Sequence, residues 1–120
     1  MTELRIGRDI ALRLARLGAE VLSIARRLPS GEYRHVAQQL VRAGTSCGAN
    51  YEEARGAQSR ADFIHKVSIA AKEARETVFW LGVLDQCTPD LVLAPTLDEA
   101  RQLSAILSAS SNTARRNASK

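Results

Sequence analysis

The chain has few of the residues that most catalytic and metal-binding sites require. Its 120 residues include two cysteines and two histidines, and aromatic residues make up 4% of the sequence. No cysteine or histidine stands at the spacing of a metal site, so we expect no metal and no cofactor. With so few aromatic rings, the core must be aliphatic and rich in alanine. Cys47 falls on an apolar helical face and is predicted to be a small core residue.

Long apolar runs are also missing. Residues 1–7 lack the apolar segment of a secretory signal, and no run approaches the length of a membrane span. We therefore expect a protein of the cytoplasm with reduced thiols and no membrane partner.

What the sequence does contain is helical periodicity. Apolar residues recur at steps of three and four, the spacing of one helix face. The pattern covers four stretches, at about residues 4–28, 31–55, 59–87 and 96–111. Short links join them, which predicts one all-α domain over residues 1–111, an antiparallel up-down four-helix bundle. Residues 112–120 are polar and basic without an apolar anchor, and we expect a disordered tail there.

Capping residues support these boundaries. Ser30 is a suitable N-cap for the second helix. Ser59 and Asp62 resemble a capping box at the start of the third, and Thr96 with Glu99 forms one at the start of the fourth.

Two helices carry more apolar surface than one core face needs. The first helix has a second apolar stripe beside its heptad seam, and the third carries large apolar residues off its seam. A homo-oligomer is the expected consequence, and the residues predicted for its interface are Leu4, Leu22, Ile69, Phe79, Trp80 and Val83.

Glutamates on the second and third helices suggest a di-metal site, and such sites in four-helix bundles use Glu-x-x-His motifs. No such motif occurs here. A structural polar network is therefore the preferred interpretation of Asn50, Glu53, Glu73 and Glu76, and a functional role is the alternative. No serine or cysteine stands in a nucleophile motif, and we expect no enzyme activity.

The basic residues concentrate at the two ends of the chain. The net charge is +4, of which residues 1–30 supply +3 and the tail +3, while residues 31–111 sum to −2. Backbone-directed binding of RNA or DNA is a specific hypothesis for such charges. Its candidate residues are Arg8, Arg13, Arg16, Arg26, Arg27, Arg115, Arg116 and Lys120.

The segment around the second and third helices resembles a known bacterial family. Three successive motifs, T-S-C-G-A-N-Y-E-E-A, R-A-D-F-I-x-K and K-E-A-x-E-T-x-x-W-L, are similar to those of the four-helix-bundle proteins encoded in intervening sequences of 23S rRNA genes. That family is similar in turn to the accessory variability determinant of diversity-generating retroelements. The resemblance is dense over residues 36–84.

The resemblance implies more than the residues themselves do. Relatives assemble as homopentamers, barrels of five bundles, and the retroelement relative binds a reverse transcriptase and nucleic acid. Two functions follow as alternatives. One is a non-enzymatic oligomer associated with 23S rRNA or other nucleic acid. The other is a protein-interaction scaffold that recruits another protein and contacts no nucleic acid.

Overall fold

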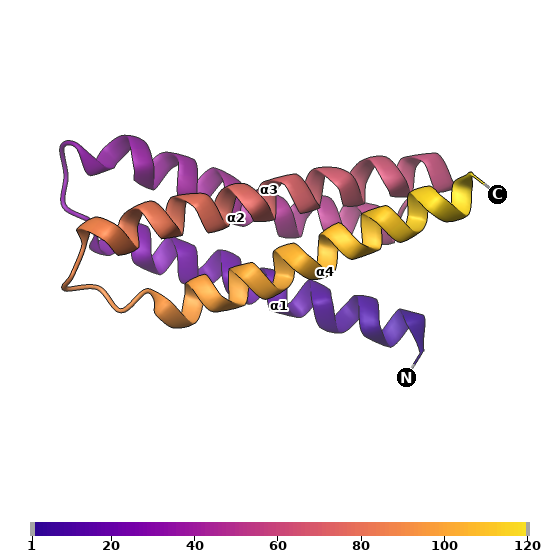
Figure 1. The fold of residues 1–120 in the computed structure, drawn as a ribbon, viewed down its shortest axis with the longest axis horizontal. Helices are drawn as coiled ribbons and strands as arrows, with labels where there is room; N and C mark the ends of the chain where they lie inside the picture. The colour runs from indigo at the N-terminus through magenta and orange to yellow at the C-terminus, as the bar shows by residue number, and fades with distance from the viewer. Residues whose placement is uncertain (1, 120) are drawn as a thin grey trace.

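The computed structural model describes residues 2–119, which form four long helices (Figure 1). These are α1 (Glu3–Arg27), α2 (Tyr33–Arg55), α3 (Arg60–Cys87) and α4 (Ala94–Ala118). Successive helices run in opposite directions, so both chain termini lie at one end of a molecule measuring 49 × 26 × 20 Å. Residues 2–119 contain no strand, and the predicted all-α four-helix fold is confirmed.

The core is aliphatic and rich in alanine, as the scarcity of aromatic residues predicts. In α1, the residues at heptad spacing that are buried are Leu14, Leu17, Val21 and Ile24. Leucines and alanines of the other three helices complete the core, and Cys47 lies fully buried among them. Burying one such leucine contributes about 1.5–3 kcal/mol, so this core is the main source of stability.

Glycines bring α1 and α2 into close contact. A Cβ atom on Gly44 would lie 2.8 Å from Cγ1 of Val21, and one on Gly18 would lie 3.6 Å from the carbonyl oxygen of Gly44. The two backbones thus meet where both helices lack side chains. The same crossing fixes the relative height of α1 and α2 along the bundle.

The contact between α1 and α4 is smaller and includes polar contacts between side chains. α1 meets α4 over fewer residues than it meets α2. The Arg13 guanidinium donates two hydrogen bonds to the Glu99 carboxylate, at 2.9 and 2.7 Å. The Thr96 hydroxyl donates to the Glu20 carboxylate at 3.0 Å. We call these two contacts the α1–α4 clasp.

The predicted capping box of the fourth helix is wrong. The helix begins at Ala94, and Pro95 occupies its first turn, where the missing N–H costs nothing. Thr96 and Glu99 therefore lie inside the helix, and their side chains form the α1–α4 clasp. Ser59 does cap α3, accepting from the backbone N–H of Asp62 at 3.0 Å.

Ser30 does not cap α2. Gly31 adopts a left-handed conformation, with φ of 91°, and separates Ser30 from a helix that begins at Tyr33. The backbone N–H of Arg34 bonds the Gly31 carbonyl oxygen at 3.0 Å instead.

The predicted disordered tail is replaced by an extension of α4 to Ala118. Its anchors are polar, which an apolar pattern cannot reveal. Ser111 is buried and bonds Ser68 of α3 at 2.8 Å between hydroxyl oxygens. Arg115 donates to the same Ser68 hydroxyl at 2.9 Å, and Arg60 donates to the carbonyl oxygen of Asn117 at 3.4 Å.

Candidate nucleic-acid interface

The antiparallel arrangement gathers arginines from all four helices at one end of the bundle. The start of α1 and of α3 and the end of α2 and of α4 lie at that end, where the start of α1 stands apart from the end of α4 (Figure 1). We call this the basic end, and its arginines are Arg5, Arg8, Arg55, Arg60, Arg115 and Arg116. Residues far apart in the sequence thereby lie at the same end of the bundle.

The two ends of the bundle differ in charge. Counting the ten residues of each helix nearest the basic end, seven cations (the six arginines and Lys66) face five carboxylates, a net charge of +2. Those carboxylates are Glu3, Asp9, Glu52, Glu53 and Asp62. The same count at the opposite end, with the connecting loops, gives five cations against six carboxylates, a net charge of −1. The basic end is therefore the more electropositive end of the bundle.

Several of these arginines are available to a ligand. Within residues 2–119, no ion pair engages Arg5, Arg8, Arg60 or Arg116. Arg115 bonds only the Ser68 hydroxyl, which leaves its charge uncompensated. The Arg55 guanidinium, in contrast, pairs with Glu52 at 2.7 Å.

The sequence prediction selected some of these residues and missed others. Arg8, Arg115 and Arg116 do lie at the same end of the bundle, whereas Arg26 and Arg27 lie at the opposite end. Arg16 lies midway along α1, and Lys120 falls outside the described residues. Arg5, Arg55 and Arg60 were missed. The predicted antiparallel topology was the signal that places them at the same end as Arg8.

Arg13 is occupied by the α1–α4 clasp, and its place among the nucleic-acid candidates is not supported by its contacts. Its double hydrogen bond to Glu99 raises the pKa of Arg13 and lowers that of the Glu99 carboxyl. A phosphate would have to displace this carboxylate.

The predicted polar network divides into separate contacts. Lys66 pairs with Glu53 at 2.7 Å, and Arg42 pairs with Glu73 at 3.0 Å and also with Glu76. Asn50 bonds within α2, donating to the carbonyl oxygen of Ser46 at 3.0 Å. The ion pairs hold α2 against α3. No group of three His, Cys, Asp or Glu side chains in residues 2–119 is close enough to hold a metal ion.

The residues predicted for an oligomer interface differ in exposure. Leu4 is 84% exposed, Phe79 58% and Leu22 47%, while Ile69 and Val83 are half-buried. Trp80 lies between two rings of its own chain, with centroid distances of 6.0 Å to His35 and 4.9 Å to Phe79. Its Nε1 is buried and finds no acceptor within the described chain.

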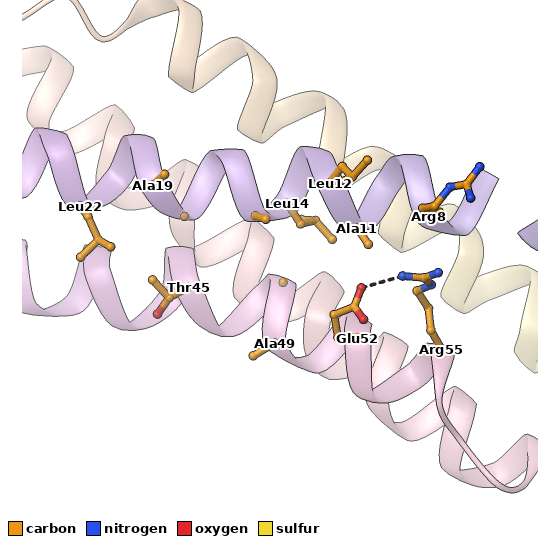
Figure 2. A pocket seen from close by; sticks show the side chains of 13 residues that line it. Arg8, Ala11, Leu12, Leu14, Ala19, Leu22, Thr45, Ala49, Glu52 and Arg55 are labelled. Atoms are coloured by element: carbon orange, nitrogen blue, oxygen red, sulfur yellow. Dashed lines mark hydrogen bonds and ion pairs between the residues drawn. The ribbon is translucent and has the colours of Figure 1, made fainter. Parts of the chain in front are cut away.

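An apolar groove runs along the outer side of α1 and α2 (Figure 2). Its larger part, of ≈ 580 Å³, has a floor of small residues that includes Ala15, Gly48 and Ala49. Arg8, Glu52 and Arg55 form its polar end, as Figure 2 shows. A second hollow of ≈ 390 Å³ continues toward the other end, and its lining residues are Ala25, Ala37, Gln38, Val41 and Arg42.

The two cysteines are free thiols that differ in exposure, Cys47 being buried and Cys87 exposed. Burial raises the pKa of the Cys47 thiol to about 11, so it stays protonated at neutral pH and acts as a packing residue. In the described chain, no helix combines the length and apolar character that crossing a bilayer requires.

Comparison with known proteins agrees with the fold. Residues 9–109 match the model of the 23S rRNA-intervening sequence protein family. A crystal structure of a protein of unknown function, from the S23 ribosomal protein family of Bacteroides thetaiotaomicron VPI-5482, is similar to this chain with a TM-score of 0.75 and 28% identity. The similarity covers 88% of this chain and 97% of that one. No curated protein matches the chain. Since the family match spans most of the sequence, the chain belongs to the 23S rRNA-intervening sequence protein family.

Proposed function

We propose that this protein is a non-enzymatic, bacterial, cytoplasmic homo-oligomer that associates with RNA through its basic end. The observation that carries the proposal is the location of five arginines at one end of the bundle, without an ion pair in the described chain; they are Arg5, Arg8, Arg60, Arg115 and Arg116. Membership of a family named for 23S rRNA intervening sequences makes ribosomal RNA the first ligand to test.

Binding of this kind is directed at the phosphate backbone. The basic end offers guanidinium groups, which bind phosphate oxygens in pairs. Tyr51, the aromatic residue beside Arg55, is buried and so gives bases no surface on which to stack. We therefore expect weak dependence on sequence and strong dependence on salt. The retroelement accessory protein that the sequence resembles is basic and binds nucleic acid, which supports the same mode.

Oligomerisation strengthens such weak contacts. A ring of parallel bundles would present all its basic ends on one face, and linked contacts raise the overall affinity through effective concentration. The resemblance implies five copies. The exposed apolar side chains of α1 and α3 support self-association without fixing the number.

Point substitutions test the proposal better than truncation, because residues 112–118 pack on α3. The test variant is Arg115→Gln with Arg116→Gln, and the matched control is Arg26→Gln with Arg27→Gln at the opposite end. Affinity for a fluorescently labelled 23S rRNA fragment is measured by anisotropy over a range of salt concentrations.

We expect the Arg115 and Arg116 variant to bind more weakly and with a shallower dependence of log K on log salt. The slope falls by about 0.7–0.9 for each phosphate that the variant no longer neutralises. The control variant should bind like the native protein. Equal losses of affinity in both variants, or no loss in either, would contradict a site at the basic end.

A protein-interaction scaffold is the second candidate, and the apolar groove on α1 and α2 favours it. Apolar grooves between helices receive amphipathic helices of partner proteins. Under this alternative, the native protein would show no salt-sensitive RNA binding, and substitutions at the basic end would leave its partner unaffected.

A further inference from the structure

We propose that the groove on α1 and α2 of one copy receives Ile69 and Phe79 of a second copy, so that successive copies join face to face in one direction. The inference rests on the proposed homo-oligomer and assigns the two surfaces that meet. It commits the groove to a second copy of this chain.

One surface is a line of residues on the outer side of α3. They follow steps of three and four and are Ile69, Lys72, Glu76, Phe79 and Val83; we call them the α3 ridge. Phe79 is 58% exposed, one of the more exposed large apolar side chains of the chain. In residues 2–119, α3 contacts α2 and α4 and stays clear of α1. The ridge and the groove are therefore distinct surfaces on the two sides of α2, and they adjoin where Glu76 of the ridge pairs with Arg42 of the second hollow.

The other surface offers two hollows separated along α1. Ala15 lines the larger hollow and Ala25 the second, ten residues further on. Ile69 and Phe79 are also ten residues apart. At 1.5 Å per residue, both spacings are about 15 Å. Because α1 and α3 run in the same direction, the two projections and the two hollows occur in the same order.

The contacts of α2 place the ridge at the same height as the groove. The Lys66–Glu53 and Glu76–Arg42 ion pairs bracket Ile69, which puts it level with Gly48 and Ala49 in the larger hollow. The Trp80–His35 contact puts the neighbouring Phe79 close to the level of Ala37, which lines the second hollow.

Because the ridge and the groove lie at matching heights, copies related by a rotation alone can bring them into contact. A rotation about an axis parallel to the bundle keeps every residue at its own height, so each ridge meets the groove of the next copy without sliding along it. Two different surfaces that meet in this way form a heterologous interface, which closes into a ring when the rotation between copies is a whole fraction of a turn. The large side chains of the ridge then enter hollows whose floor consists of alanine and glycine. This resembles the knobs-into-holes packing of helices.

A disulfide between copies tests the pairing. In a Cys87→Ser background, Ala15→Cys is combined with Ile69→Cys, and the purified protein is oxidised and run on a denaturing gel without reductant. The remaining native thiol, Cys47, is fully buried. Within one chain, α1 and α3 do not touch, so a bond between these positions joins two copies. A disulfide needs Cα atoms within about 7 Å.

The matched control combines Ala15→Cys with Phe79→Cys, which moves the second thiol about 15 Å along the ridge. We expect a ladder of covalent multimers for the first pair, which disappears on reduction, and only single-chain protein for the control. Failure of the first pair to cross-link in a protein of oligomeric native mass would overturn this interface while leaving the proposed oligomer standing. Equal ladders in both would also overturn it. A native protein of single-chain mass would overturn both proposals.

Discussion

Small residues decide how closely α1 and α2 approach. Gly18 and Gly44 let the two backbones meet, and Val21 fills the space above Gly44. The sequence places Gly44 and Gly48 four residues apart in the second helix, and close packing of that helix could be predicted from this spacing. The sequence could not predict that Val21 fills the space above Gly44, because this contact depends on how the two helices cross.

Replacing Gly44 with alanine tests this contact. The new methyl would lie 2.8 Å from Val21 Cγ1, inside a packed core. Overpacking outweighs the better helix propensity of alanine, and we expect a net loss of about 1–2 kcal/mol in the free energy of unfolding. Urea denaturation measures it.

Gly82→Ala in α3 is the matched control, because nothing lies within 4 Å of its added methyl. It should gain up to about 1 kcal/mol from propensity alone. If both substitutions stabilise the protein, the close contact at Gly44 is not a constraint on packing.

Single residues also show what a charge count leaves out. The sequence shows Arg115 and Arg116 without an acidic neighbour and Arg8 next to Asp9, and the structure places all three at one end of the bundle. Arg13 is also a basic residue of the first helix, yet its guanidinium is hydrogen-bonded to the carboxylate of Glu99, which lies far away along the chain. A pairing across helices depends on the register of the bundle, which periodicity leaves undetermined.

Among the helices, the least tightly held contact is the one between α1 and α4. The Arg13–Glu99 pair bridges it with side chains that remain about 30% exposed, at 31% and 30%. The bond to Arg13 holds the pKa of the Glu99 carboxyl below its ordinary value of 4.5. A carboxyl whose pKa is lower in the folded state stabilises the protein above the unfolded value, and this stabilisation disappears as the pH falls through the folded value.

We therefore predict that Arg13→Gln removes an acid-sensitive part of the stability. At neutral pH the substitution should cost about 0.5–1 kcal/mol, since partly exposed ion pairs contribute modestly. Below the folded pKa of Glu99 the difference from the native protein should vanish. Denaturation midpoints measured from pH 7 down to pH 3 test the trend.

Arg26→Gln serves as the control, because Arg26 lies on the same helix and has no ion pair within residues 2–119. It should show no comparable pH-dependent difference. A constant cost of Arg13→Gln at all pH values would mean that the arginine acts through packing.

The element boundaries show where sequence reasoning stops. Heptad spacing predicts all four helices because each buries an apolar face. The extension of α4 to Ala118 escaped prediction because Ser68, Ser111 and Arg115 anchor it through polar groups. The start of α4 was misplaced because Thr96 and Glu99 also fit a cap, while their actual partners lie on α1.

At the scale of the whole molecule, topology creates the candidate site. Charge at the first helix and the C-terminal segment is visible in the sequence, and an antiparallel bundle of four helices places those two regions at the same end. The same topology adds Arg55 from the end of α2 and Arg60 from the start of α3. Each copy in the proposed oligomer adds one basic end, so self-association is expected to strengthen RNA binding.

The most direct test of that account is the native mass by light scattering of protein purified at low salt, with the 260/280 nm absorbance ratio of the same peak. We predict a mass of several 13.1 kDa chains together with bound RNA, and an absorbance ratio that falls to that of protein alone when the salt concentration is raised. A single-chain mass with the absorbance ratio of protein at every salt concentration would contradict it.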